Sequence, residues 1–181
     1  MKKLSVKGLA ICGICIAVAF VLSFIKFLSL PFGGSITLCS MLFVCIIGYM
    51  YGPKYGLISA FAYGLLQFIQ DPYIVTPVQV IIDYFLAFTA LGLSGFIKTG
   101  KYRLQIGYLL GITGRFICAV ISGVVFFGEY APEGWNVLVY SMAYNGLVIY
   151  VEGIITIIIL CIPAVKNGID RIVSMSINDQ N

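Results

Sequence analysis

Apolar residues along this chain form long, nearly uncharged runs that alternate with short polar segments rich in proline and glycine. A helix of about 20 apolar residues spans a bilayer core, and helices satisfy all of their own backbone hydrogen bonds there. No β-barrel alternation is visible, so the pattern predicts an all-α membrane protein. The runs predict six transmembrane helices, at residues 8–27, 36–52, 55–70, 77–97, 104–127 and 138–163. The second and third are short, and we expect them to be tilted or partly buried by neighbours.

Turn-forming residues mark the breaks between these runs, because proline lacks a backbone N–H and glycine has little helical preference. The breaks fall at residues 30–35, 51–54, 71–77, 98–103 and 129–135. The fifth, EYAPEGW, holds two carboxylates, two aromatic rings, a proline and a glycine. Either it is a solvated connector, or it forms a lid over a binding pocket.

Basic residues predict the orientation in the membrane. With six spans, every basic cluster falls on one side, which the positive-inside rule assigns to the cytoplasm. We therefore expect one six-helix transmembrane domain at 1–165, a short cytoplasmic tail at 166–181, and both termini in the cytoplasm. The clusters are Lys2, Lys3 and Lys7, then Lys54, then Lys98, Lys101 and Arg103, and finally Lys166 and Arg171.

Composition supports the bilayer as the solvent. The chain has 181 residues, of which 61% are hydrophobic and 10% charged, whereas soluble domains are about 25% charged. The alternative is a soluble bundle with an apolar core. The formal charge of +4 reflects orientation and does not indicate nucleic-acid binding.

Catalytic and metal chemistry is not expected. The chain has no histidine, and its six cysteines lie almost entirely inside apolar runs, so neither a metal site nor disulfides are implied. No P-loop, paired catalytic carboxylates or cofactor motif is visible. Any ATP-driven work would belong to a partner, and this chain is not expected to be an enzyme.

Three ionisable residues lie within predicted spans, where a charge is costly and usually has a partner or a ligand. Arg115 and Glu152 fall near the middle of their helices, and an internal ion pair between them would fix helix packing. Asp83 lies near the outer end of its helix. It is either a solvated helix-end carboxylate or the counter-charge for a cationic ligand that arrives from outside.

Aromatic residues gather at the depth of Asp83, among them Tyr73, Tyr84, Phe126, Phe127, Trp135, Tyr140 and Tyr144, with Asn145 beside them. They form either an interfacial aromatic belt or the walls of a pocket for a flat aromatic cation. Small residues at 119 and 123 leave room beside the fifth helix, for another helix or for a ligand.

Several longer stretches resemble one known family. These are GGSIT with YGPKYGL, then YGLLQFIQDPYIVTPVQVIIDYFLAFTALGLSGF, and finally ISGVVFFGEYAPEGWNVLVYSMAYNG. Between residues 33 and 158 the chain resembles the thiamine-specific substrate-binding subunits, or S components, of energy-coupling factor (ECF) transporters. The resemblance implies a six-helix protein of the cell membrane that binds thiamine from outside. The implied partners are a transmembrane coupling subunit and two ATPase subunits.

The resemblance also implies roles for individual residues. Asp83 falls at the acidic position that contacts the aminopyrimidine, and Gly13 and Ala17 fall at the small-residue motif that faces the coupling subunit. Ala119 stands where the family often has histidine, and Phe127 stands where it often has tryptophan. Trp135 and Tyr130 would cover the ligand or the membrane interface from the fifth loop. The other expected binding residues are Tyr73, Tyr84, Arg115, Gly123, Tyr140, Ser141 and Asn145.

The resemblance leaves two alternatives open. The missing histidine at Ala119 allows an S component for another vitamin or for a thiamine precursor. A membrane scaffold without a transported ligand is the other alternative.

Overall fold

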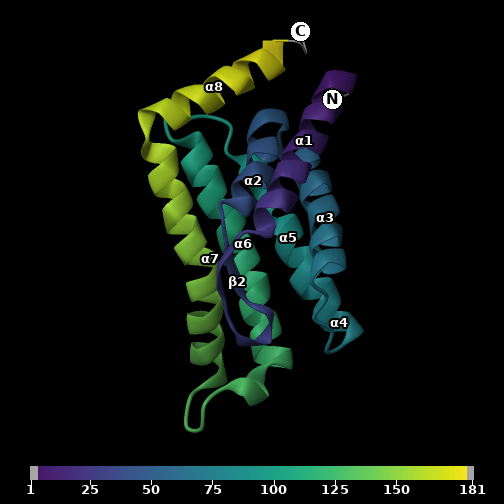
Figure 1. Ribbon diagram of the computed structural model, residues 1–181, viewed down its shortest axis with the longest axis vertical. Helices are drawn as coiled ribbons and strands as arrows, with labels where there is room; N and C mark the ends of the chain where they lie inside the picture. The colour runs from purple at the N-terminus through teal and green to yellow at the C-terminus, as the bar shows by residue number, and fades with distance from the viewer. Residues whose placement is uncertain (1–3, 179–181) are drawn as a thin grey trace.

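The computed structural model describes residues 4–178, which form an elongated helical bundle (Figure 1). Four of its helices are long and apolar enough to cross a membrane. The all-α class is confirmed apart from one small hairpin, whereas the number of spans and the orientation stay predictions. The main helices are α1 (Val6–Ser23), α2 (Ser40–Tyr51), α3 (Pro53–Gln70), a composite helix at 77–96, α6 (Arg103–Phe126), α7 (Val137–Cys161) and α8 (Pro163–Asn178).

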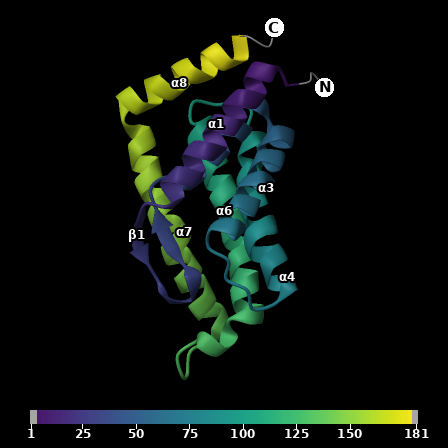
Figure 2. The same ribbon diagram turned by 45° about the vertical axis from the view of Figure 1, so that its right-hand side comes forward.

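A two-stranded antiparallel hairpin, β1 (Lys26–Ser29) and β2 (Ser35–Thr37), lies between α1 and α2 (Figure 2). The predictions of helix over 8–27 and 36–52 were therefore wrong at 26–27 and 36–37. Pro31 cannot donate a backbone hydrogen bond, and Gly33 has φ +89°, which favours glycine. These residues reverse the chain, and the segments on either side pair as antiparallel strands.

The composite helix contains an irregularity near its start. It consists of α4 (Pro77–Val80), a π-helical segment (Ile81–Leu86), α5 (Ala87–Thr89) and a 3-10 segment (Ala90–Phe96). Thr76 caps its start by accepting from the Gln79 N–H at 3.1 Å. Within the π segment the Ala87 N–H donates to the Ile82 carbonyl, five residues back. Such segments are rare in proteins, and those that occur often lie at functional sites. This one contains Asp83.

The core of the bundle is centred on α2. Nine of its residues are buried, including Val44, Cys45 and Ile47. It contacts α1, α3, α6 and the 3-10 segment. A helix of 12 residues can occupy this place because its neighbours, rather than lipid, surround it.

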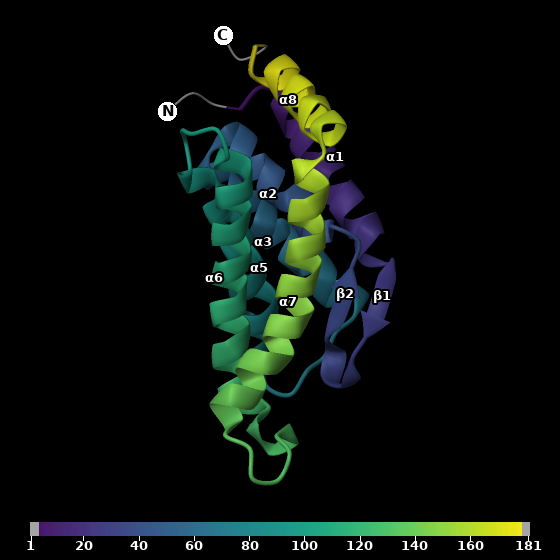
Figure 3. The same cartoon turned by 90° about the vertical axis from the view of Figure 1, so that its left-hand side faces the viewer.

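Helix α8 is an element that the sequence pattern did not predict, because its residues had been assigned to the polar tail. It lies across one end of the bundle beside the start of α1, whereas the 127–136 loop lies at the other end (Figures 1 and 3). The basic residues of α8, the 98–103 loop and the α2–α3 turn share that first end. Lys2 and Lys3 lie outside the described residues.

Candidate functional site

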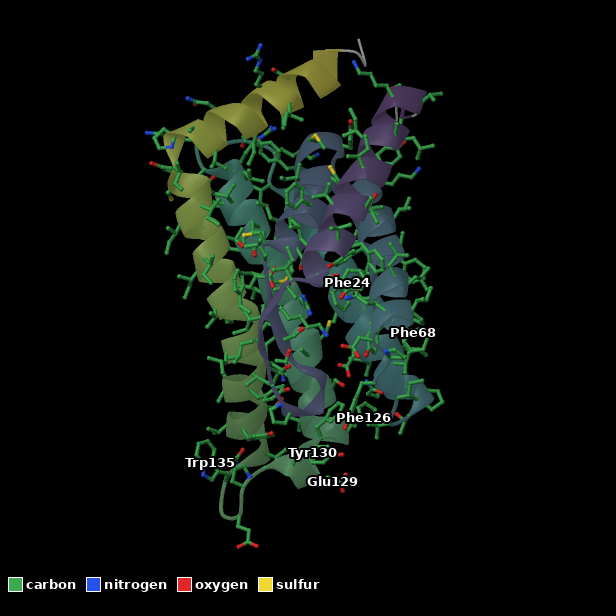
Figure 4. All side chains as sticks on the ribbon, in the orientation of Figure 1. Phe24, Phe68, Phe126, Glu129, Tyr130 and Trp135 are labelled. Atoms are coloured by element: carbon green, nitrogen blue, oxygen red, sulfur yellow. The ribbon has the colours of Figure 1, made fainter. Side chains whose placement is uncertain are left out.

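A cavity of about 180 Å³ opens between the hairpin, the α3–α4 loop, the composite helix, α6 and α7. Nine of the ten residues expected to bind a ligand line it, namely Tyr73, Asp83, Tyr84, Arg115, Gly123, Phe127, Tyr140, Ser141 and Asn145. Trp135 does not line it. Its side chain is 56% exposed and lies on the outside of the bundle near the start of α7 (Figure 4).

Asp83 is held in the cavity wall by its own helix. The Gln79 side-chain amide donates to Asp83 Oδ2 at 2.7 Å, and Gln79 Oε1 accepts from the Val75 N–H at 3.1 Å. Gln79 is 1% exposed, so it fixes the carboxylate from behind. Because a carboxylate has two acceptor oxygens, Oδ1 can still accept from a ligand. Across residues 4–178 no ion pair joins Asp83 to a basic side chain.

Tyr84 fixes the loop that precedes this helix. Its hydroxyl donates to the Asp71 carbonyl and accepts from the Tyr73 N–H, both at 2.8 Å. The loop backbone is therefore tied to the π segment, and the ring of Tyr73 is placed at the cavity wall. Asp83 and Tyr84 are consecutive, and both line the cavity.

Three aromatic rings form a row along the cavity. The centroids of Tyr73 and Phe127 are 5.9 Å apart with planes at 34°, and those of Phe127 and Tyr130 are 6.1 Å apart with planes at 33°. The hydrogen bond with the Tyr73 side chain raises the pKa of Tyr130 above its usual value. Such a row offers π faces to a flat or cationic ring.

Of the EYAPEGW segment, Tyr130 lines the cavity, whereas the other six residues do not. Gly128–Tyr130 forms a short 3-10 turn that carries this ring inward (Figure 4). Glu129 and Glu133 are exposed. The lid expected from this loop thus rests on a single side chain, and its role stays a prediction.

The polar corner of the cavity depends on the close approach of α6 and α7. A Cβ atom built on Gly123 would lie 2.1 Å from Ser141 Oγ. This is closer than a Cβ atom approaches another heavy atom, so any larger residue at 123 would force Ser141 to move. The Ser141 hydroxyl donates to the Val120 carbonyl at 3.0 Å, and Asn145 Nδ2 donates to the Ala119 and Ser141 carbonyls at 3.3 and 3.0 Å. With its amide nitrogen engaged by the protein, Asn145 has its carbonyl oxygen left for a ligand donor.

The expected ion pair between Arg115 and Glu152 is wrong. Glu152, 2% exposed, accepts from the Thr37 N–H and hydroxyl at 3.2 and 2.7 Å, and from the Ser40 hydroxyl and Met41 N–H at 3.2 and 3.3 Å. These donors surround the carboxylate at the start of α2. The Arg115 guanidinium instead lies 4.1 Å from the centroid of the Phe88 ring.

The hairpin closes one side of the cavity and is fastened at two places. Lys26 Nζ lies 2.6 Å from Asp71 Oδ2, which joins β1 to the α3–α4 loop. The Tyr144 hydroxyl donates to the Pro31 carbonyl and accepts from the Gly34 N–H, the latter at 3.0 Å. All of these residues except Pro31 line the cavity.

Sequence reasoning missed Gln79, Lys26 and Asp71 as cavity residues. The spacing of four between Gln79 and Asp83 on one helix could have indicated the first. Lys26 and Asp71 are 45 residues apart on segments expected to be a helix and a loop. No local pattern links them.

Together these features define a class: a helical membrane protein with a cavity that has one anchored carboxylate, an aromatic row and an amide corner. A sequence profile of the thiamine transporter protein family (Thia_YuaJ) matches residues 9–170. The chain therefore belongs to that family, and the resemblance seen in the sequence is confirmed.

Individual relatives agree with this assignment. Thiamine transporter ThiT of Bacillus subtilis (strain 168) is 35% identical over 150 residues, covering 75% of this chain and 78% of that protein. ThiT of Lacticaseibacillus paracasei (strain ATCC 334) is 31% identical over 120 residues, covering 56% and 59%. The solved structure of ThiT from Listeria monocytogenes superposes with a TM-score of 0.69 at 28% identity, covering 87% of this chain and 96% of that one.

Proposed function

We propose that this protein binds thiamine in the cavity and acts as the S component of an ECF-type transporter. The observation that carries the proposal is Asp83, a carboxylate in the cavity wall whose hydrogen-bond partner is the neutral Gln79. A cavity with such an acid and a row of rings suits a flat organic cation better than a neutral or anionic solute. Thiamine carries a cationic thiazolium ring and an aminopyrimidine with N–H donors.

The two halves of thiamine fit two parts of the cavity. Asp83 accepts from the aminopyrimidine through a charge-assisted hydrogen bond. Tyr140 and the Asn145 carbonyl oxygen orient its other polar groups. The thiazolium ring lies against the faces of Tyr73, Phe127 and Tyr130, which attract a cation most strongly where water is excluded.

Transport requires partners that this chain does not supply. In this proposal the basic end is cytoplasmic, the chain spans the membrane six times, and the cavity takes thiamine from outside. Gly13 and Ala17 are exposed on α1, and a Cβ atom on Gly13 would meet nothing within 4 Å. This open small-residue face would admit a helix of the transmembrane coupling subunit, and two ATPase subunits would drive uptake.

Asp83→Asn tests the binding site. It keeps the shape and removes the charge, so we expect thiamine affinity to fall about tenfold or more, the loss of a charge-assisted bond. Isothermal titration calorimetry on the purified protein measures this. Asp170→Asn, the same change on α8, is the matched control and should leave the affinity unchanged. Equal affinity in the two variants would reject the role of Asp83.

A second candidate ligand follows from Ala119, which lines the cavity where the family often has histidine. The missing imidazole makes room for a different vitamin or for a thiamine precursor. Titration with thiamine, with its aminopyrimidine half and with its thiazolium half distinguishes these cases. The main proposal requires thiamine to bind more tightly than either half.

A further inference from the structure

A second cavity, of about 190 Å³, lies at the end of the bundle that α8 covers. Its walls come from α2, from the 98–103 loop with the start of α6, from the end of α7 and from α8. The lining includes three cations, Lys101, Arg103 and Lys166, one carboxylate, Asp170, and two buried leucines, Leu104 and Leu160. None of these residues belongs to the thiamine cavity.

The charges of this second cavity do not balance. Three cations face one carboxylate, and Asp170 forms no ion pair with any of them within the part of the chain that the structure describes. Arg103 and Lys166 are half-buried. Lys101 and Asp170 are exposed. Bringing Arg103 and Lys166 together in a partly desolvated site is unfavourable unless an anion joins them.

Arg103 is already positioned to receive such an anion. Its guanidinium lies 4.0 Å from the centroid of the Tyr49 ring, and Nη1 donates to the Lys98 carbonyl at 3.1 Å. Stacking and this hydrogen bond hold the plane of the group. The remaining N–H donors keep the fork geometry that matches two phosphate oxygens.

Apolar surface continues from the cavity along α6. Within two turns of Arg103, Ile106, Leu109 and Leu110 are 50%, 41% and 38% exposed. In a helix apolar enough to cross a membrane, such side chains contact acyl chains. A ligand with a phosphate and hydrocarbon tails therefore matches both the cavity and the surface beside it.

We propose that this second cavity binds the phosphate headgroup of an anionic phospholipid. Lys101, Arg103 and Lys166 contact the phosphate, and the acyl chains lie along the exposed face of α6. The bound headgroup joins α2, α6 and α8, so it holds α8 across the end of the bundle.

Native mass spectrometry of the purified full-length chain, with added dioleoylphosphatidylglycerol or dioleoylphosphatidylcholine, tests the proposal. We expect one phosphatidylglycerol to be retained about tenfold more tightly than phosphatidylcholine. The Lys101→Gln/Lys166→Gln variant should lose this preference. The Lys54→Gln/Arg171→Gln variant, which also loses two cations from the same end but outside the cavity, should keep it. Circular dichroism confirms that each variant is folded.

A second arm, titration with inorganic phosphate against chloride at equal ionic strength, separates the possible sources of the phosphate. Displacement of phosphatidylglycerol by inorganic phosphate supports the cavity as a phosphate site that a lipid fills. Phosphate binding without any preference between the two lipids overturns the lipid assignment. Equal loss in both double variants would mean diffuse attraction to a basic surface, and it overturns the proposal, as does the absence of any phosphate or phosphatidylglycerol effect.

Discussion

Gly123 shows how one absent methyl group shapes the cavity proposed to bind thiamine. The contact that its missing Cβ permits brings Ser141 and Asn145 against α6, so the glycine acts through helix approach and not through a side chain on the ligand. A resemblance identifies such a position, but it does not say which of these two roles the residue has. The short distance from a built Cβ to Ser141 Oγ favours the role in helix approach.

Gly123→Ala should therefore weaken both the fold and the site. Overpacking costs about 1–3 kcal/mol, so we expect a lower midpoint of thermal unfolding and a loss of thiamine affinity by calorimetry. Gly146→Ala on α7 is the matched control, because its Cβ would meet Phe116 at an ordinary 3.7 Å. A variant at 123 that behaves like the one at 146 would contradict the close packing of the two helices.

A comparison of two adjacent phenylalanines distinguishes the effect of the aromatic row on binding from that of general hydrophobicity. Phe127 lines the cavity and Phe126 does not. Phe127→Leu removes a π face from the ligand and should reduce thiamine affinity about fivefold, a cation–π contribution of about 1 kcal/mol. Phe126→Leu should change the affinity little. Binding measured by quenching of intrinsic fluorescence compares the two, and equal losses would argue for an interfacial belt.

At the scale of elements, apolar runs were sufficient to predict most helices. The structure has α3, the composite helix, α6 and α7 within about two residues of their predicted bounds, the usual uncertainty of helix ends. The hairpin was missed because 24–28 stays apolar, apart from Lys26, after α1 has ended. Helix α8 was missed because its residues are mostly polar. The π segment was missed because residues 81–88 are nearly all apolar or aromatic, so there is no helical periodicity that an extra residue in one turn could interrupt.

The hairpin should control how fast the ligand leaves. Tyr144→Phe removes the hydroxyl that binds the Pro31 carbonyl and the Gly34 N–H. Losing hydrogen bonds of about 1 kcal/mol each should raise the thiamine dissociation rate several-fold, measured by stopped-flow fluorescence. Tyr150→Phe removes a hydroxyl on the same helix that bonds to Thr113 instead. An unchanged rate in Tyr144→Phe, or the same increase in Tyr150→Phe, would show that the hairpin does not gate the cavity.

For the whole molecule, the residues proposed to bind thiamine and those proposed to contact the coupling subunit lie on different surfaces. The cavity residues come from the hairpin, the composite helix, α6 and α7, whereas Gly13 and Ala17 are exposed on α1. Composition and charge could predict a membrane protein with one basic end. They could not predict the partners of Glu152 and Arg115, because Thr37 and Phe88 come from other elements of the chain.

Replacing both Gly13 and Ala17 by leucine should abolish thiamine uptake by cells that carry the full transporter and leave thiamine binding in detergent intact. The reason is steric, since large side chains there keep a partner helix away. Both positions are exposed, and a Cβ atom on Gly13 would meet nothing within 4 Å of this chain. Radiolabelled uptake and calorimetry measure the two properties. Parallel loss of both would mean that these residues serve only the fold.

Glu152 has a consequence for how the chain matures in the membrane. Helix α2 has no acid in its own first turn, and the carboxylate that receives its Met41 N–H comes from α7, 111 residues later. A ribosome must therefore deliver nearly the whole protein before this early helix gains its negative cap. Until then, the start of α2 and the strand before it have unsatisfied donors, so a nascent chain halted before α7 should be exposed to membrane proteases that spare the finished protein.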